Sequence, residues 1–221
     1  MQQTWNHLLF AHWPVAKETL RLLVPSVLEL DTFNGQCYVA VTPFHMSNVR
    51  GRWLPAIPGT SKFAELNVRT YVTFGGKPGV FFFSLDAASR AAVWGARMTY
   101  HLPYFHARMK VQETNGQIRY ESFRNPGTQF RGTYRPVGAV QLRDPGTLEH
   151  WLTERYCLYT VFHGSVLRAE INHEQWPLQD AEAEISANTM ASAAGIALPQ
   201  VLPALHFSQK LDVLIWPLKK V

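Results

Sequence analysis

Apolar and polar residues alternate over short stretches of this chain, and turn signals separate the stretches. The alternation is clearest on the two sides of Asn115-Gly116, where it predicts two strands with one face on a core and one in water. Asn-Gly between such stretches is the strongest short-range hairpin signal. The same pair at Asn34-Gly35 predicts a second hairpin, which joins residues 28–30 to residues 36–42.

Other stretches extend this strand pattern over most of the chain. A glycine-rich segment, residues 75–79, predicts a turn between a strand at 68–74 and a strand at 80–85. The 80–85 stretch has hardly a polar position, so we expect it to be buried on both faces. Further strands are predicted at residues 4–11 and 209–216.

Only a few short helices are expected. Leucine and valine recur at helical spacing between Pro14 and Pro25, which predicts a helix that Pro14 opens and Pro25 ends. Thr147 can cap another helix, in which Leu148 and Trp151 share a face. The fold class predicted is therefore mainly β with a few short helices, an antiparallel barrel or sandwich, in a single domain over residues 1–221.

The segment of residues 44–62 lacks a convincing period. It contains two prolines, two glycines, Trp53 and the arginines Arg50 and Arg52. A loop of this length inside a compact domain is usually functional or mobile. Two interpretations stay open: a lid at the mouth of a pocket, or a plain surface crossover.

Composition excludes several classes of protein. With 47% hydrophobic and 17% charged residues over 221 positions, the chain can bury a sizeable core. It shows neither a signal peptide nor an apolar run long enough to span a membrane, so we expect a soluble cytoplasmic protein. Cys37 and Cys157 stand in apolar strand-like stretches and are expected to be buried thiols.

The formal charge of +5 raises the question of nucleic-acid binding. Five arginines alternate with aromatic residues between residues 119 and 143. An antiparallel sheet with arginines towards water and aromatics towards the core gives the same pattern, and no recognition motif accompanies the charge. Nucleic acid is therefore not expected as a partner.

Motifs for nucleotides and for α/β-hydrolase chemistry are absent from the sequence. His101 and His106 are five residues apart, with neither a cysteine nor a carboxylate beside them, which is not the spacing of a zinc site. No metal and no cofactor is predicted. Either histidine could serve as a general acid or base near neutral pH, or be a hydrogen-bonding wall residue.

Four blocks of sequence resemble the YqjF-like family: Leu-Val-Pro to Leu-Glu-Leu-Asp at residues 23–31, Phe-Ala-Glu-Leu-Asn-Val-Arg-Thr-Tyr-Val at 63–72, Gly-Val-Phe-Phe-Phe-Ser-Leu-Asp at 79–86, and Gly-Ala-Arg-Met-Thr-Tyr-His-Leu-Pro-Tyr at 95–104. The resemblance covers residues 4–216. YqjF-like proteins are in turn similar to acetoacetate decarboxylase. That similarity implies an antiparallel β-barrel with the active site in a conical interior.

The same resemblance implies that decarboxylase chemistry is lost. That chemistry needs a lysine to form a Schiff base, with a second lysine beside it. Tyr104 and Phe105 stand at those positions, and Asn6 stands where the decarboxylase has a pocket arginine. The pocket glutamate matches Glu65. Lys110 is the nearest lysine, and strand alternation points it towards water.

The residues left to line a ligand cavity carry phenol, imidazole, carboxyl and guanidinium groups. They are Glu65, Arg69, Tyr71, Arg97, Tyr100, His101, Tyr104 and His106. Glu65 is either a pocket acid or half of a structural ion pair with Arg69 or Arg97, because a buried carboxylate must be paired. In either case we expect an arginine within salt-bridge reach of it. No catalytic residue can be assigned.

Two functions from different classes remain open. The first is a small-molecule-binding barrel for a small organic acid or a carbonyl compound, with or without an enzymatic activity other than Schiff-base decarboxylation. The second is an assembly or partner-binding module whose barrel is filled by its own side chains. Because the decarboxylase family is oligomeric, the resemblance also implies that this chain could form a homo-oligomer. A pocket of several hundred Å³ that reaches Tyr104 and Glu65 favours the first function.

Overall fold

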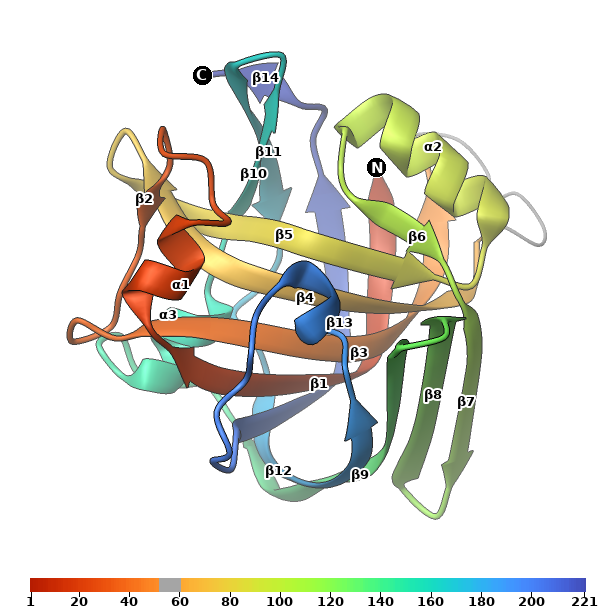
Figure 1. The fold of residues 1–221 in the computed structure, drawn as a ribbon. Coiled ribbons are helices and arrows are strands. Elements are labelled where there is room, and N and C mark those ends of the chain that lie inside the picture. Colours follow the sequence, from red (N-terminus) through yellow and green to blue (C-terminus); the bar gives the residue numbers. More distant parts are fainter. Residues whose placement is uncertain (52–60) are drawn as a thin grey trace.

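The computed structural model describes residues 1–51 and 61–221, which form long strands and a few short helices (Figure 1). The strands are β1 (Gln2–Val15), β2 (Glu29–Leu30), β3 (Cys37–Arg50), β4 (Phe63–Phe74), β5 (Lys77–Ala87), β6 (Tyr104–His106), β7 (Arg108–Thr114), β8 (Gln117–Asn125), β9 (Thr128–Gln141), β10 (Cys157–Phe162), β11 (Ser165–Asn172), β12 (Leu178–Asn188), β13 (Ala204–Ile215) and β14 (Lys219–Lys220). The helices are α1 (Lys17–Arg21), α2 (Arg90–Tyr100), α3 (Leu148–Thr153) and a 3₁₀ turn, η1 (Ser192–Ala194). The prediction of a mainly β fold is confirmed.

One large sheet contains all fourteen strands of the described residues. Twelve of them follow the order β14-β11-β10-β5-β4-β3-β1-β13-β12-β9-β8-β7, while β2 pairs with β4 and β6 with β5. In addition, β11 pairs with β13, so that the pairings among β11, β10, β5, β4, β3, β1 and β13 return to their starting point. Strands β12, β9, β8 and β7 continue from β13 as a second part of the sheet, from the bottom to the lower right of Figure 1.

The sheet is mixed, whereas an antiparallel one was predicted. Strand β5 pairs in parallel with β6 and with β10. A parallel neighbour needs a crossover connection, and α2 supplies it between β5 and β6. Helix α2 was not predicted from the sequence, although Ser89 caps it by accepting a hydrogen bond from the Ala92 N–H at 3.3 Å.

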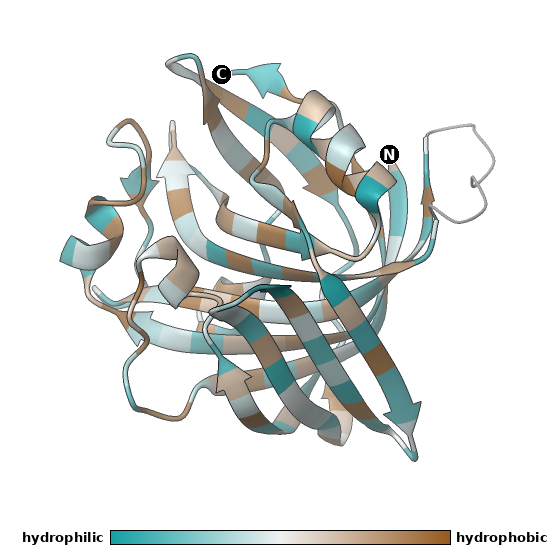
Figure 2. Cartoon of the chain, turned by 45° about the vertical axis from the view of Figure 1, so that its right-hand side comes forward, coloured by the Kyte–Doolittle hydropathy of each residue, from teal (hydrophilic) through white to brown (hydrophobic). Residues whose placement is uncertain are grey.

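Strand β4 separates two hydrophobic cores. Its odd-numbered residues Phe63 and Tyr71 belong to one core, and its even-numbered residues Leu66 and Val68 belong to the other. Alternate side chains of a strand point to opposite faces, so a strand buried on both faces serves both cores. Hydropathy accordingly changes from residue to residue along many strands in Figure 2.

Turn chemistry was predicted well from the sequence. Asn115 and Gly116 have positive φ values of 51° and 76° and join β7 to β8. Gly75 and Gly76 likewise join β4 to β5. The Thr147 side chain accepts a hydrogen bond from the His150 N–H at 3.4 Å, and α3 follows it as predicted.

Three local predictions were wrong. Pro14 lies inside β1, and the helix between the two prolines is only α1, because β1 pairs with β3 as far as Val15. Asn34-Gly35 closes only a tight turn with a bridge between Phe33 and Gln36, while β2 pairs with β4. The stretch at residues 80–85 is not buried throughout, since Phe81, Phe82 and Phe83 are half-buried.

Part of the predicted loop at residues 44–62 is strand. Strand β3 continues to Arg50, and Phe44 to Met46 pair with β4. Arg50 donates a hydrogen bond to the Gln2 side chain at 2.8 Å. Residues 52–60, with Arg52 and Trp53, lie outside the described residues, and so does the proposed lid.

The two cysteines are buried and free, as predicted. Burial raises the pKa of both thiols. None of the helices in residues 1–51 and 61–221 is long and apolar enough to cross a membrane.

Candidate functional site

The inward face of β4 carries a row of polar side chains. Glu65, Asn67 and Arg69 occupy alternate positions, so all three point to the same side of the strand, opposite Leu66 and Val68. All three are buried. A row of polar groups directed into a protein interior needs partners, which makes this face the natural starting point for a site.

A cavity lies beside this row. Its walls come from the start of β1, from β3, β4 and β5, from α2 and β6, and from the segment between α3 and Trp176. The centre of a water molecule can range over about 70 Å³ inside it, which corresponds to about two or three waters at the density of the liquid. The cavity reaches Glu65 and Tyr104 as expected for ligand binding, but it is smaller than the several hundred Å³ that the sequence-based criterion required. It therefore suits a molecule of a few non-hydrogen atoms rather than a large ligand.

Glu65 and Tyr104 meet in this cavity. The Tyr104 hydroxyl donates a hydrogen bond to Glu65 Oε2 at 3.1 Å. Only 2% of the Glu65 residue is exposed. Burial raises the pKa of its carboxyl to about 8, the Tyr104 hydrogen bond lowers it in part, and the nearby Asp86 carboxylate raises it.

The prediction that Glu65 lies within salt-bridge reach of an arginine was wrong. Among the ion pairs of the described residues, none involves Glu65. The prediction rested on the rule that a buried carboxylate needs a cation. Glu65 has a neutral phenol as its hydrogen-bond donor instead, and that hydrogen bond offsets only part of the rise in pKa that burial causes.

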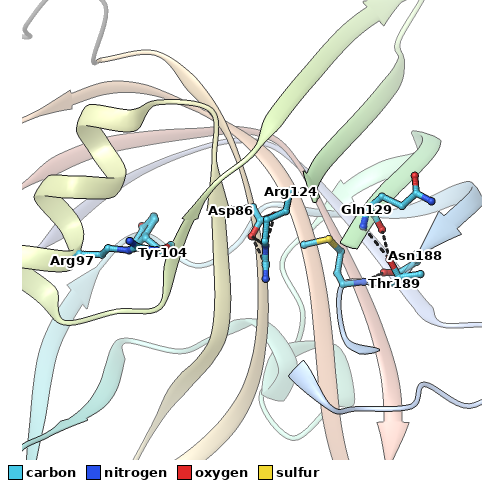
Figure 3. Close-up of polar contacts among 8 residues, drawn as sticks. Asp86, Arg97, Tyr104, Arg124, Gln129, Asn188 and Thr189 are labelled. Carbon is cyan, nitrogen blue, oxygen red and sulfur yellow. Dashed lines mark hydrogen bonds and ion pairs between the residues drawn. The ribbon is translucent and has the colours of Figure 1, made fainter. Parts of the chain in front are cut away.

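Tyr104 and Phe105 point to opposite sides of β6. Tyr104 lines the cavity, while the Phe105 ring lies between two guanidinium groups, 5.6 Å from Arg97 Cζ and 4.0 Å from Arg124 Cζ. Arg97 also donates from Nε to the Tyr104 carbonyl at 2.7 Å (Figure 3). These contacts fix the backbone of β6, so the Tyr104 phenol is held in place from outside the cavity.

The other polar end of the cavity is cationic. Arg69 is 7% exposed, and its Nε and Nη2 have no hydrogen-bond partner among the described residues. Arg155 donates from Nη1 to Asp31 at 2.5 Å, and its Nη2 lacks a partner there. Both guanidiniums lie close to the Tyr71 phenol and partly offset the rise in its pKa that burial causes.

Further polar groups of the lining lack partners among the described residues. They are Thr42 Oγ1, Asn67 Oδ1 and Trp176 Nε1. Buried polar atoms without partners are uncommon in folded proteins, and each one needs an explanation. Several of them line this one cavity.

The structure brings together four of the eight predicted pocket residues. Glu65, Arg69, Tyr100 and Tyr104 line the cavity, and Tyr71, Arg97, His101 and His106 do not. The His101 ring stacks on Phe162, with the ring centroids 3.8 Å apart. His106 and Arg97 are exposed.

Sequence reasoning missed several wall residues. Asn67 could have been found, because it continues the polar alternation between Glu65 and Arg69. Arg155, His173 and Trp176 come from a distant part of the chain and reach the cavity only because β10 pairs with β5. No local sequence pattern predicts such a long-range contact.

Each lysine of the chain lies away from the cavity. Six lysines are exposed: Lys17, Lys62, Lys110, Lys210, Lys219 and Lys220. Lys77 is half-buried and contacts Glu170 at 2.5 Å. Lys110 faces water as the alternation predicted. Among the described residues no group of three or more histidine, cysteine or carboxylate side chains is placed to hold a metal ion.

The five arginines between residues 119 and 143 all form ion pairs with carboxylates. Arg119 and Arg131 pair with Glu121, Arg135 with Glu182, Arg143 with Asp180, and Arg124 with the buried Asp86. The positive charge of this part of the sheet is therefore largely compensated. This compensation weakens the case for a basic surface that binds phosphates.

Comparisons with known proteins point in one direction. The chain is 53% identical to the Uncharacterized protein YqjF of Bacillus subtilis (strain 168), over all of this chain and 92% of that protein. Among solved structures, the enduracididine biosynthesis enzyme MppR complexed with pyruvate superposes with a TM-score of 0.71 at 10% identity, over 99% of this chain and 89% of that chain. Acetoacetate decarboxylase from Legionella pneumophila superposes with a TM-score of 0.66 at 15% identity, over 100% and 86%.

At these identities the solved structures show a shared fold only. The family DUF2071, described as Uncharacterized conserved protein, matches residues 2–212. Together with the YqjF identity over the full chain, this match decides the family. The chain belongs to the YqjF-like DUF2071 family, within the group of proteins that share the acetoacetate decarboxylase-like fold.

Proposed function

We propose that residues 1–221 form one small-molecule-binding barrel whose interior cavity takes a small organic acid. The ring of pairings from β11 through β5 and β1 to β13 supports the barrel. The observation that carries the ligand class is Arg69, a buried guanidinium in the cavity wall with two nitrogen atoms unpartnered among the described residues.

A carboxylate is the occupant that such a wall favours. A buried charge without a partner is costly, and a carboxylate can accept two parallel hydrogen bonds from one guanidinium. Arg155 adds positive charge at the same end, although Asp31 already compensates part of it. The walls are otherwise mainly apolar, with Leu8, Phe44 and Leu158 among them. An apolar body with one carboxylate fits both features.

The proposed small-molecule-binding barrel is not a Schiff-base decarboxylase. No lysine lines the cavity, and the phenol of Tyr104 cannot form an iminium. Acetoacetate followed by borohydride should therefore leave the mass of the chain unchanged. A lysine adduct formed together with release of carbon dioxide would contradict this assignment.

Calorimetry with butanoate and with the uncharged butanamide tests the ligand class. Butanoate should bind and butanamide should bind at least tenfold more weakly, because only the carboxylate neutralises Arg69. Arg69→Met should abolish butanoate binding and raise the midpoint of thermal unfolding, since it removes an uncompensated buried charge. Arg135→Met is the matched control, because Arg135 is an exposed arginine paired with Glu182. Equal binding of butanoate to both variants would refute the proposal.

The rival function, an assembly or partner-binding module, has one observation in its favour. Leu22 is 87% exposed and Leu202 is 94% exposed, so both leucines are accessible to a partner. Light scattering across a concentration series, with the double variant Leu22→Ser and Leu202→Ser as comparison, tests it. A stable oligomer that the double variant loses supports this module, and a monomer at all concentrations argues against self-assembly.

A further inference from the structure

The cavity has two chemically different polar ends. Glu65 and Arg69 lie four residues apart on the same face of β4, so their Cα atoms are separated by about 13 Å along the strand. Asn67 lies between them on that face. A guanidinium that needs an anion therefore stands at one end, and a carboxyl group at the other.

Uncharged groups dominate the surroundings of the Glu65 side chain. Tyr104 of β6 donates to Oε2, and Tyr100 of α2 lines the same cavity. The Tyr120 hydroxyl of β8 donates to the Glu65 backbone carbonyl at 2.7 Å. The charged group of β5 near Glu65 is the Asp86 carboxylate, whose charge opposes ionisation of Glu65.

The basic side chains around the Glu65 end of the cavity do not form an ion pair with Glu65 in the described structure. Arg124 of β8 is paired with Asp86, and Arg97 of α2 is exposed and bonded to the Tyr104 carbonyl. His45 of β3 is next to Phe44, which pairs with Glu65, and burial lowers the pKa of its imidazole, so it adds no fixed positive charge. Arg69, on the same strand as Glu65, forms no ion pair with it.

The two carboxyl oxygens of Glu65 differ in their hydrogen bonds. The phenol donates to Oε2, while Oε1 has no hydrogen bond to another described residue. A proton on Oε1 would then be free to be donated into the cavity. The bond that Oε2 accepts polarises the carboxyl group and strengthens Oε1–H as a donor.

We infer that the Glu65 carboxyl carries a proton in the resting protein and, positioned by Tyr104, donates it in a hydrogen bond to an uncharged oxygen of the ligand. This inference rests on the proposed function, because Arg69 holds the ligand's carboxylate at the other end. The ligand class that fits both ends is a short carboxylic acid with a second, uncharged acceptor oxygen, either oxo or hydroxyl. Asn67 faces the middle of such a molecule.

The direction of the pKa shift agrees with this geometry. Burial raises the pKa of Glu65 to about 8, so the protonated form predominates at neutral pH and is lost as the pH rises through about 8. Affinity for an acceptor oxygen should follow the protonated fraction. At pH 9.5 that fraction is about thirtyfold lower than at pH 6.5, as each pH unit above the pKa lowers it tenfold.

Calorimetry on the full chain with four-carbon acids tests the inference. Butanoate is the reference, and 2-oxobutanoate, acetoacetate and 3-hydroxybutanoate are the oxygenated probes, all of them ionised at pH 6.5 and pH 9.5. At least one oxygenated acid should bind tenfold or more tightly than butanoate at pH 6.5, and this preference should vanish at pH 9.5. Butanoate itself should bind equally at both values.

Three variants assign the effect to the proposed pair. Glu65→Gln keeps a donor that does not titrate, so the preference should persist at both pH values. Glu65→Leu removes the donor, so the preference should vanish while butanoate still binds. Tyr104→Phe should reduce the preference, and the pH at which it is lost should rise, because the phenol lowers the pKa of Glu65.

The outcomes separate the two proposals. If all four acids bind equally at pH 6.5, the inference is overturned and the organic-acid function stands. A preference for oxygenated acids that grows with pH would also overturn it, since ionised Glu65 would then be the binding form. If none of the acids binds, the proposed function fails and this inference falls with it.

Discussion

Two buried carboxyl groups on neighbouring strands have different kinds of partner in this protein. Asp86 of β5 is fully buried and forms an ion pair with Arg124, whose Nε lies 2.9 Å from Oδ1 and 3.1 Å from Oδ2 (Figure 3). Glu65 of β4 is 2% exposed and has Tyr104 as its side-chain donor. Burial raises the pKa of both groups, but only for Asp86 does an arginine act against the rise.

The difference separates a structural role from a role in a site. Arg124 joins β8 to β5 through Asp86, and its guanidinium also lies over Phe105, so that pair fastens β6 and the second part of the sheet to the first. Glu65 faces a cavity, and its side chain has one hydrogen bond from a neutral phenol in place of an ion pair. A carboxyl that is buried but left without a cation is suited to donating or exchanging a proton.

The arginines show the same contrast. Arg124 has its carboxylate partner within the chain, whereas Arg69 in the cavity wall has none among residues 1–51 and 61–221. Thus Asp86 and Arg124 form an ion pair in the interior, whereas Glu65 and Arg69 on the neighbouring strand β4 have no ion-pair partner among the described residues. Stability alone does not account for the second arrangement, because it costs folding free energy.

The largest effect is expected from breaking the structural pair. Arg124→Met should lower the free energy of unfolding by about 4 kcal/mol at pH 7, because it leaves the fully buried Asp86 carboxylate unpaired. Chemical denaturation measures this loss. The double variant Arg124→Met with Asp86→Leu should recover much of it, and a loss below about 1 kcal/mol in the single variant would show that the pair is not structural.

Glu65→Gln should act in the opposite direction and depend on pH. The folded-state pKa of about 8 lies above the ordinary value of 4.5, so the folded state binds the extra proton between these values and wild-type stability falls as pH rises towards 8. At pH 9 the variant should be more stable than wild type by about 3 kcal/mol, below the roughly 5 kcal/mol that the full pKa difference implies.

At pH 4.5 the two proteins should be similar in stability, because Glu65 is then protonated in the folded state and glutamine replaces a neutral group of the same shape. Denaturation curves at pH 4.5, 7 and 9 give the comparison. A constant difference across this range would contradict a raised pKa for Glu65.

Tyr104→Phe should have a smaller effect. The loss of one hydrogen bond at 3.1 Å should cost about 1 kcal/mol at neutral pH. The pH region over which stability declines should move upward, because the phenol helps the carboxyl to ionise. Tyr156→Phe, a more exposed tyrosine bonded to Glu154, is the matched control and should leave that pH region unchanged.

The smallest effect is expected at the surface. Lys77 and Glu170 contact each other at 2.5 Å, but their side chains are 40% and 39% exposed. Lys77→Met should therefore change the free energy of unfolding by about 0.5 kcal/mol or less, since solvent screens such pairs. A loss comparable to that of Arg124→Met would mean that burial is not what distinguishes the pairs.

Part of the candidate site could be read from the sequence. Glu65 and Arg69 alternate with apolar residues, and the resemblance placed Tyr104 at the reaction centre of a related fold. Together with Tyr100, these residues were identified as cavity residues from the sequence. The partner of Glu65 was not. The choice between an arginine and Tyr104 depends on how β6 lies along β5, a parallel pairing that the missed helix α2 makes possible.

The sequence by itself determined the features that depend on neighbouring residues. Asn115-Gly116 specified a hairpin because two adjacent residues adopt positive φ, Thr147 specified a helix start, and period-two alternation specified which β4 residues share a face. Only the tertiary structure decided which distant walls enclose that face. Arg155 and Trp176 reach the cavity because β10 pairs with β5 and β11 pairs with β13, and such pairings are set by packing over the whole sheet, not by any local pattern.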